Sequence, residues 1–184
     1  MAAAASGHGT ALDALFGDDE VEVDCQATDR TTGRTALMLA VTAFSPSCVA
    51  MLLENDASDI NRQDSLGLTA LQLAVLLADE PDADGEVLEL IREELGSHGV
   101  DISLVDGRKR SLAHIAAMSG ASDILQSLGE NEMELNMLDA AGHTPLDYAC
   151  YFGKEECVST LLSDEEFEPF NEKSDPFGPL HCAA

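Results

Sequence analysis

Small apolar side chains recur along the chain at a nearly fixed interval. Ala40, Ala74, Ala116, Ala149 and Ala183 follow one another after 34, 42, 33 and 34 residues. Each of the first four closes a short apolar string that opens, five residues earlier, with threonine or serine. Alanine at a fixed point in such a string lets a short helix approach its neighbour closely. The pattern therefore predicts a repeated short helix.

A second group of apolar residues follows each of these strings, with its members three and four positions apart. This spacing places them on one stripe of a second helix, which we expect to be buried. The stripes comprise Cys48, Val49, Leu52 and Leu53 in the first repeat, Val87, Leu90 and Ile91 in the second, Ile124 and Leu128 in the third, and Cys157, Val158, Leu161 and Leu162 in the fourth.

A turn is predicted between the second helix of one repeat and the first helix of the next. Asp64 and Gly67 define its pattern, which Asp139 and Gly142 repeat. Aspartate can cap a turn through its side chain, and glycine accepts a positive φ without strain. The other turns vary the pattern: Arg30 takes the aspartate position before Gly33, Lys109 takes the glycine position after Asp106, and Lys173 and Pro176 stand in the last turn.

Two helices and a turn repeated about every 33 residues, with the Thr-x-Leu-x-Leu-Ala core seen at 35–40 and 69–74, resemble the ankyrin repeat. The resemblance implies an all-α ankyrin-repeat solenoid of about four repeats with partial ends. We expect an irregular acidic N-terminal segment with a half-repeat at 1–32, then repeats at 33–66, 67–108 (with an acidic insertion), 109–141, 142–175 and, in part, 176–184. Because an incomplete last repeat leaves apolar surface open, a fragment of a longer array is also expected.

The net charge and the hydropathy of the chain argue against some classes of partner, such as nucleic acids and membranes. A net charge of −26, from 35 acidic and 9 basic residues, argues against binding a nucleic-acid backbone. We expect no membrane-spanning helix and no secretory signal, because no apolar run is long enough and the N-terminus lacks a basic region. The acids gather at 18–24, 79–86 and 164–175, where we expect solvated surface, with docking of a basic partner as the alternative. A cytoplasmic location is expected, with the nucleus as the alternative.

Side chains that could carry chemistry follow the period of the repeat. Catalysis is not expected, because the sequence has no nucleophile elbow, phosphate-binding loop or zinc-protease motif, and no cofactor is expected. His114 and His181 take a position at which we expect bonds to backbone and to a neighbouring hydroxyl. The cysteines are expected to be reduced and mostly buried. A metal-binding alternative would use His143, Cys150, Cys157, His181 and Cys182, although their spacing is that of the repeat rather than of a paired Cys-x-x-Cys motif.

Positions that would touch a partner protein follow from the phase of the repeat. They lie at the turn tips and at the exposed end of each first helix, where we expect contact with water. Apolar, aromatic and arginine side chains at such positions favour a protein-binding surface. For Leu76, Leu77 and Phe152 the alternative is packing under the insertion or against helices. The candidates are Leu66, Leu68, Leu76, Leu77, Arg108, Arg110, Met118, His143, Tyr151 and Phe152.

The C-terminal part carries a more specific resemblance. The string Gly-His-Thr-Pro-Leu-Asp-Tyr-Ala-Cys-Tyr-Phe-Gly-Lys-Glu-Glu-Cys-Val at 142–158, followed by Phe-Gly-Pro-Leu-His-Cys-Ala at 177–183, resembles the ankyrin-repeat regulatory subunits of serine/threonine-protein phosphatase 6. The resemblance implies a non-catalytic scaffold that bridges a phosphatase catalytic subunit, or its partner, to other proteins. Alternatives are an unrelated ankyrin adaptor, such as a ubiquitin-ligase substrate receptor, and the metal-binding protein considered above.

Overall fold

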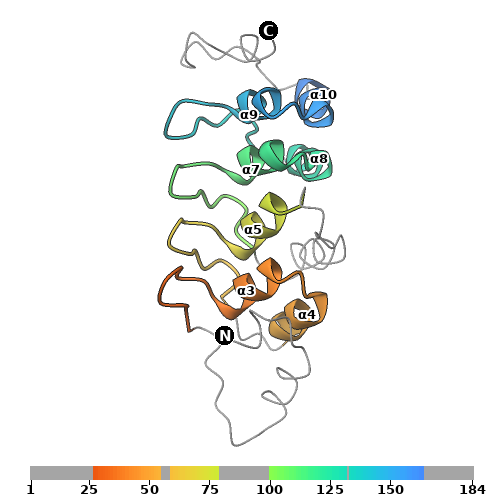
Figure 1. The fold of residues 1–184 in the computed structure, drawn as a ribbon. Helices are drawn as coiled ribbons and strands as arrows, with labels where there is room; N and C mark the ends of the chain where they lie inside the picture. Colours follow the sequence, from red (N-terminus) through yellow and green to blue (C-terminus); the bar gives the residue numbers. More distant parts are fainter. Residues whose placement is uncertain (1–26, 55–58, 79–99, 132, 164–184) are drawn as a thin grey trace, which may run out of the picture. The chain divides into compact units, whose positions relative to one another are not determined.

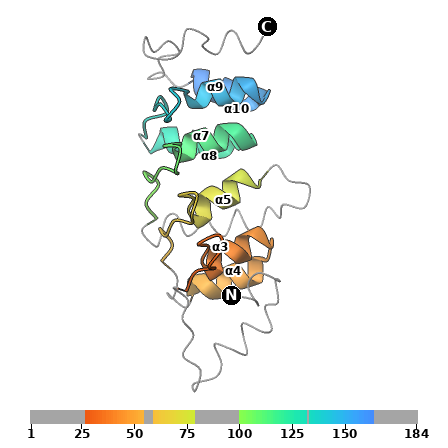
Figure 2. The ribbon, with the colours of Figure 1, turned by 60° about the vertical axis from the view of Figure 1, so that its left-hand side comes forward.

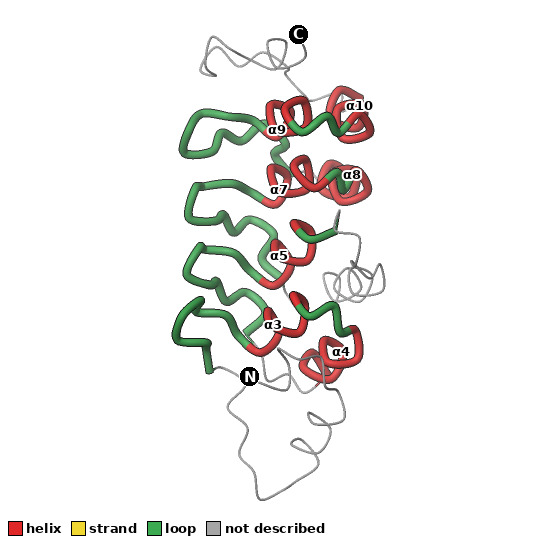
Figure 3. Tube along the Cα trace, viewed as in Figure 1, coloured by secondary structure: helices red, strands yellow, loops and turns green. Residues whose placement is uncertain are grey.

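The structure, a computed structural model, describes residues 27–54, 59–78, 100–131 and 133–163. These residues form helices and turns, with no strand among them. The chain divides into two compact units, residues 1–101 and 102–184, which are described separately. Within each unit, taken by itself, the connecting turns project from one side of the helices (Figure 3).

Unit 1 contains the helices α3 (Ala36–Thr42), α4 (Pro46–Glu54) and α5 (Ala70–Leu76). Helix α3 packs against both α4 and α5 (Figure 1). The core of unit 1 consists of side chains with almost no exposed surface, among them Leu37, Val41, Val49, Leu52, Leu73 and Val75. The apolar residues predicted for the second helix of the next repeat, Val87, Leu90 and Ile91, lie outside the described residues, as does the acidic insertion before them.

Unit 2 contains two helix pairs, α7 (Leu112–Ser119) with α8 (Ser122–Glu130) and α9 (Pro145–Tyr151) with α10 (Glu155–Ser163). Helix α7 packs against α9, and α8 packs against α10, so the two pairs stack side by side (Figures 1 and 2). Ile115, Leu125 and Leu161 are fully buried between them. This is the two-helix repeat that the apolar spacing predicted, and it confirms the all-α repeat fold.

A hydroxyl residue stands at the N-cap position of the first helix of each described repeat. Thr35 accepts a hydrogen bond from the N–H of Met38, and Thr69 accepts one from the N–H of Gln72. The side chain of Gln72 in turn accepts from the N–H of Thr69, which completes a capping box. Thr144 and Asp147 form the same reciprocal pair at α9. Each cap satisfies backbone groups that the helix leaves open and is worth about 1 kcal/mol.

The recurring alanines are buried where helices meet. Ala40, Ala116 and Ala149 expose no surface and Ala74 exposes 4%. Ala183 lies outside the described residues. One apolar stripe departs from the prediction: in α10, Cys157 and Leu161 are buried, whereas Leu162 is 54% exposed. Leu162 lies about 100° further round the helix than Leu161, away from the sides that α8 and α9 cover.

The aspartates of the turns cap backbone N–H groups as predicted. Asp64 Oδ1 accepts from the N–H groups of Leu66 and Leu68 at 2.8 and 3.0 Å. Asp106 and Asp139 repeat this arrangement with the residues two and four positions further on. Gly67 has a φ of +80°, and Lys109, at the equivalent position, has a φ of +60°. The lysine therefore adopts the left-handed conformation that glycine accepts without strain.

The first turn corrects one prediction: Asp29, not Arg30, takes the aspartate position. The carboxylate of Asp29 accepts hydrogen bonds from the N–H and hydroxyl groups of Thr31 and Thr32, and the Thr31 hydroxyl is the largest reason why its pKa lies below its usual value. The N–H of Asp29 reaches the carbonyl of Arg34, five residues on, whereas the N–H of Asp64 reaches Leu68, four residues on. This turn therefore holds one extra residue, which shifted the spacing on which the prediction relied.

Replacing Ala149 by leucine should destabilise unit 2 by about 1–3 kcal/mol, because three extra carbon atoms have no room at a fully buried position between helices. Urea unfolding followed by tyrosine fluorescence measures this, since the two tyrosines both lie in α9 and the chain has no tryptophan. Ala141→Leu, at an exposed turn position, is the matched control and should leave the midpoint unchanged. Coincident curves for Ala149→Leu and the parent would refute the assigned packing.

Candidate functional site

The candidate residues of unit 1 divide between surface and core. Leu66 is 62% exposed at the tip of its turn, and Leu76 and Leu77 are partly exposed at the end of α5. Leu68 is 3% exposed, so the expectation that its side chain is exposed for contact with a partner is wrong. Its N–H donates to Asp64 and it directly precedes the N-cap Thr69, a position from which apolar side chains pack onto the first turn of the helix.

In unit 2, four rings form a continuous cluster that we call the aromatic face: His143, Tyr148, Tyr151 and Phe152. Tyr148 and Phe152 stack with their ring centres 6.5 Å apart and their planes inclined by 9°. Tyr151 contacts Phe152 edge-to-face at 5.1 Å, and His143 contacts Tyr148 at 5.8 Å. Tyr151 is 72% exposed and Phe152 46% exposed, so these rings pack on one another and still face solvent.

Tyr148 is a member of this face that the sequence reasoning missed. It occupies the position held by Leu39, Leu73 and Ile115 in the other repeats, and this replacement of an aliphatic residue by a tyrosine is the signal that could have found it. Its hydroxyl donates to Asp139 Oδ2 at 2.8 Å. Burial, followed by this hydrogen bond, raises the pKa of Tyr148 to about 12.

Asp139 holds the turn at 139–143 by hydrogen bonds and also binds Tyr148 of the aromatic face. Burial alone would raise the pKa of this carboxyl, but hydrogen bonds from the N–H of His143, the hydroxyl of Tyr148 and the N–H of Ala141 more than offset burial, so its pKa lies below its usual value. His143 Nδ1 lies 3.7 Å from Asp139 Oδ1, and its side chain is 48% exposed. The side chain of Tyr148 is therefore held by two interactions, the hydrogen bond from its hydroxyl to Asp139 and the stacking of its ring on Phe152.

The two candidate arginines have different environments. Arg110 donates to Asp106 Oδ2 from Nε at 2.7 Å and from Nη2 at 2.6 Å, and its Nη1 lies 3.3 Å from the sulfur of Met118. Its side chain is only 13% exposed. Arg110 of the turn and Met118 of α7 are thus brought together, and the contacts of the Arg110 guanidinium are made within the protein. Arg108 and Lys109, by contrast, are exposed at the tip of the turn.

His114 has the structural role predicted for it. Its Nδ1 accepts from the N–H of Ser111 at 3.1 Å and lies 2.8 Å from the Ser111 hydroxyl. Because Nδ1 accepts, the proton of the neutral ring lies on Nε2, which donates to the carbonyl of His143 at 3.1 Å. The ring is fully buried, and burial is the main cause that lowers its pKa, against the raising effect of the His143 carbonyl. The imidazole therefore joins the two repeats of unit 2.

The residues of the metal-binding alternative do not form a site in the described part of the chain. Cys157 is fully buried, its sulfur lies 3.9 Å from the carbonyl of Ala116, and burial raises the pKa of its thiol to about 11. A high thiol pKa disfavours the thiolate that metals bind. Among the described residues no group of three or more histidine, cysteine or acidic side chains converges as a metal site would require. His181 and Cys182 lie outside these residues.

Stacked helix pairs with capped first helices and aspartate turns define the class of α-helical repeat proteins. The family described as ankyrin repeats (3 copies) matches residues 1–83 and 82–174, and the chain belongs to this family. It is similar to human Neurogenic locus notch homolog protein 1, with 31% identity over 137 residues that make up 74% of this chain. The matched region spans 5% of the length of that relative. None of the described helices is long and apolar enough to cross a membrane.

Replacing Arg110 by alanine should lower the free energy of unfolding of unit 2 by about 2 kcal/mol, because the nearly buried carboxylate of Asp106 loses two charge-assisted hydrogen bonds. Urea unfolding followed by tyrosine fluorescence measures this loss. Arg108→Ala removes the same side chain from an exposed position of the same turn and should change the stability by less than about 0.5 kcal/mol. Equal effects of the two substitutions would contradict the assigned role of Arg110.

Unit 2 should lose stability as the pH falls below about 6.5, the ordinary histidine pKa. The folded protein holds His114 neutral and lowers its pKa, so between 6.5 and that lowered pKa the unfolded chain binds more protons and protonation favours unfolding. The stabilisation is thus complete above 6.5 and is lost as the pH falls through the folded pKa. Unfolding midpoints measured between pH 7.5 and 5 test this.

His114→Gln is the matched variant for this pH dependence. Gln72 occupies the equivalent position in α5, where its side chain accepts the N–H of the capping residue as His114 does. The variant should be about 1 kcal/mol less stable at pH 7.5, because it loses the hydrogen bond to the His143 carbonyl. Its stability should then change little down to pH 5.5. A slope equal to that of the parent would assign the pH dependence to another group.

Proposed function

We propose that this chain is a protein–protein interaction module whose principal contact surface in unit 2 is the aromatic face with the neighbouring turn tips. The observation that carries the proposal is the exposure of Tyr151, 72%, next to Phe152 at 46%. Apolar rings left in water at a fixed geometry are typical of protein interfaces, and tyrosine supplies a large contact area with few rotatable bonds. Membership of the ankyrin-repeat family supports the same class of function.

The aromatic face is prepared for binding by contacts within the protein. Tyr148 is held by Asp139 and carries Phe152, which in turn carries Tyr151. Because these rings are already ordered, little side-chain entropy is lost when a partner covers them. His143 extends the surface to the turn, so an occupant can contact both the end of α9 and the tip of the loop.

A finer proposal is that the partner belongs to a serine/threonine protein phosphatase assembly. The string at 142–158, which contains all four residues of the aromatic face, supports it through its resemblance to the regulatory subunits. A ubiquitin-ligase adaptor is the competing assignment within the same class. The buried thiols of Cys48 and Cys157 fit a reducing compartment, which supports a cytoplasmic location.

Tyr151→Ala should weaken binding to the partner by about 2 kcal/mol, which is about 30-fold in Kd, while unfolding stays at the parent midpoint. Leu162→Ala is the control, because it removes an apolar side chain of comparable exposure, 54%, from α10. Affinity purification with mass spectrometry from cell extract identifies the captured proteins, and titration calorimetry with the captured partner measures the affinity. Retention of the same partners at unchanged affinity by Tyr151→Ala would exclude this surface.

The same purification separates the finer assignments. Recovery of a phosphatase catalytic subunit supports the regulatory scaffold, and recovery of ubiquitin-ligase subunits supports the adaptor. Elemental analysis of the purified chain tests the metal-binding rival, for which zinc would have to be present in stoichiometric amount.

A further inference from the structure

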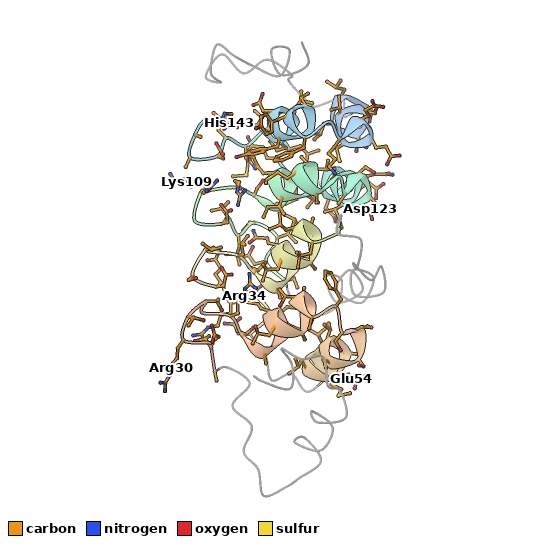
Figure 4. All side chains as sticks on the ribbon, in the orientation of Figure 1. Arg30, Arg34, Glu54, Lys109, Asp123 and His143 are labelled. Carbon is orange, nitrogen blue, oxygen red and sulfur yellow. The ribbon has the colours of Figure 1, made fainter. Side chains whose placement is uncertain are left out.

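Charges in unit 2 are separated between two sides. Arg108 and Lys109 are exposed at the tip of one turn, and His143 is exposed at the next. Figure 4 shows Lys109 and His143 at the turns and Asp123 on the opposite side, on α8. The exposed acids of the two outer helices, α8 and α10, are Asp123, Glu130, Glu155 and Glu156. The turn side is therefore basic in a chain whose net charge is −26.

The aspartates of the turns do not neutralise Arg108 and Lys109. The side chains of Asp106 and Asp139 are only 2% exposed. The Oδ2 atom of Asp106 accepts a hydrogen bond from Arg110, and that of Asp139 accepts one from the Tyr148 hydroxyl. Within the described residues, the side chains of Arg108 and Lys109 form no ion pair. Their positive charge is directed to solvent and to whatever binds there.

The bases lie next to the aromatic face. The carbonyl of Arg108 accepts a hydrogen bond of 2.8 Å from the N–H of Ala140, which fastens the turn at 106–110 to the turn at 139–143. His143 ends this second turn and contacts Tyr148. A single extended segment lying across the turns can therefore contact Arg108, His143 and the aromatic rings together.

Lys109 gives a second and independent indication. Its φ is +60°, whereas the equivalent positions of the flanking turns hold Gly67 and Gly142 with φ of +80° and +87°. A side chain in this conformation strains the backbone where glycine would not. Strain retained at an exposed position points to a function of the side chain, and for lysine at a turn tip the function is its charge.

We infer that this surface binds an acidic segment of a partner protein, whose carboxylates meet Arg108 and Lys109 and whose apolar or aromatic side chain covers Tyr151 and Phe152. The inference rests on the proposed binding function and specifies its partner. The acidic outer helices repel such a segment and so favour the turn side. At physiological ionic strength the more distant acids of the chain are screened beyond about 8 Å, so contacts at the turns decide the affinity.

Three synthetic peptides test the inference on the full chain. They share their length and apolar residues, including one phenylalanine, and differ in whether the remaining positions are Glu, Gln or Lys. At physiological salt, the Glu peptide should bind at least about tenfold more tightly than the Gln peptide, and its affinity should fall as salt is raised. Tighter or equal binding of the Gln or Lys peptide, or no binding of the Glu peptide, overturns the inference.

Lys109→Gly is the decisive variant, because it restores the residue of the flanking turns. Its melting temperature should equal or exceed that of the parent, so weaker binding cannot be attributed to misfolding. Binding of the Glu peptide should fall about threefold to tenfold, and the Arg108→Gln/Lys109→Gly double variant should bind the Glu and Gln peptides alike. Arg62→Gln, which removes one exposed positive charge from unit 1, should leave the affinity unchanged. Unchanged binding by Lys109→Gly overturns the inference.

The outcome is separable from that of the proposed function. A cellular partner that is lost with Tyr151→Ala but retained with Lys109→Gly would leave the binding module standing and remove the acidic segment. Two other occupants would also overturn the inference. If the full chain with the acids of 164–175 changed to Asn and Gln binds the Glu peptide more than about tenfold more tightly, the chain's own segment is the occupant. If the parent forms a dimer that Lys109→Gly dissociates, a second copy is the occupant.

Discussion

The structure depends on a buried carboxylate in the turns that begin at Asp64, Asp106 and Asp139. Asp64, Asp106 and Asp139 have side chains that are at most 2% exposed, and one oxygen of each accepts two backbone N–H groups of its own turn. A charge removed from water must be hydrogen-bonded at all its acceptor sites, or it destabilises the fold by several kcal/mol. The second oxygen therefore requires a donor from elsewhere. The identity of that donor determines which side chains of the turn are left for a partner.

In each of these three turns the second carboxylate oxygen accepts its hydrogen bond from a different donor. Asp64 takes the guanidinium of Arg34, which reaches it from the preceding turn at 3.4 Å and so connects two turns of unit 1. Asp106 takes Arg110 from its own turn and leaves the neighbouring bases exposed. Asp139 takes the hydroxyl of Tyr148, which brings an aromatic ring to the surface at the end of α9. The basic tip and the aromatic face of unit 2 are thus consequences of how two buried charges are satisfied.

The sequence determined what depends on local periodicity. The buried alanines and the paired helices of the described repeats follow from neighbours three to five residues apart, and these were predictable. Three features were not, because they depend on hydrogen bonds rather than on spacing. Asp29 lies one position before the residue expected at the aspartate position of the turn. It is identified only by the hydrogen bonds that it accepts from backbone N–H groups. Arg110 resembles an exposed anchor by position, yet its donors are turned to Asp106. Tyr148 occupies an aliphatic core position, and only its bond to Asp139 explains why its ring lies under Phe152.

Lys109 shows why a repeat fold can carry such a surface. Stability in a stack of repeats is approximately a sum over repeats and the interfaces between neighbours, so strain of about 1 kcal/mol in one turn remains local. In the turn at 106–110 this strain is offset nearby, because Asp106 accepts two N–H groups and both nitrogens of the Arg110 fork. The tip residue is therefore held by its neighbours whatever its side chain, which leaves that side chain available for charge. The hydrogen bonds of Asp106 thus have two consequences. They hold the base of the turn, and they allow the side chain at its tip to differ from one repeat to the next.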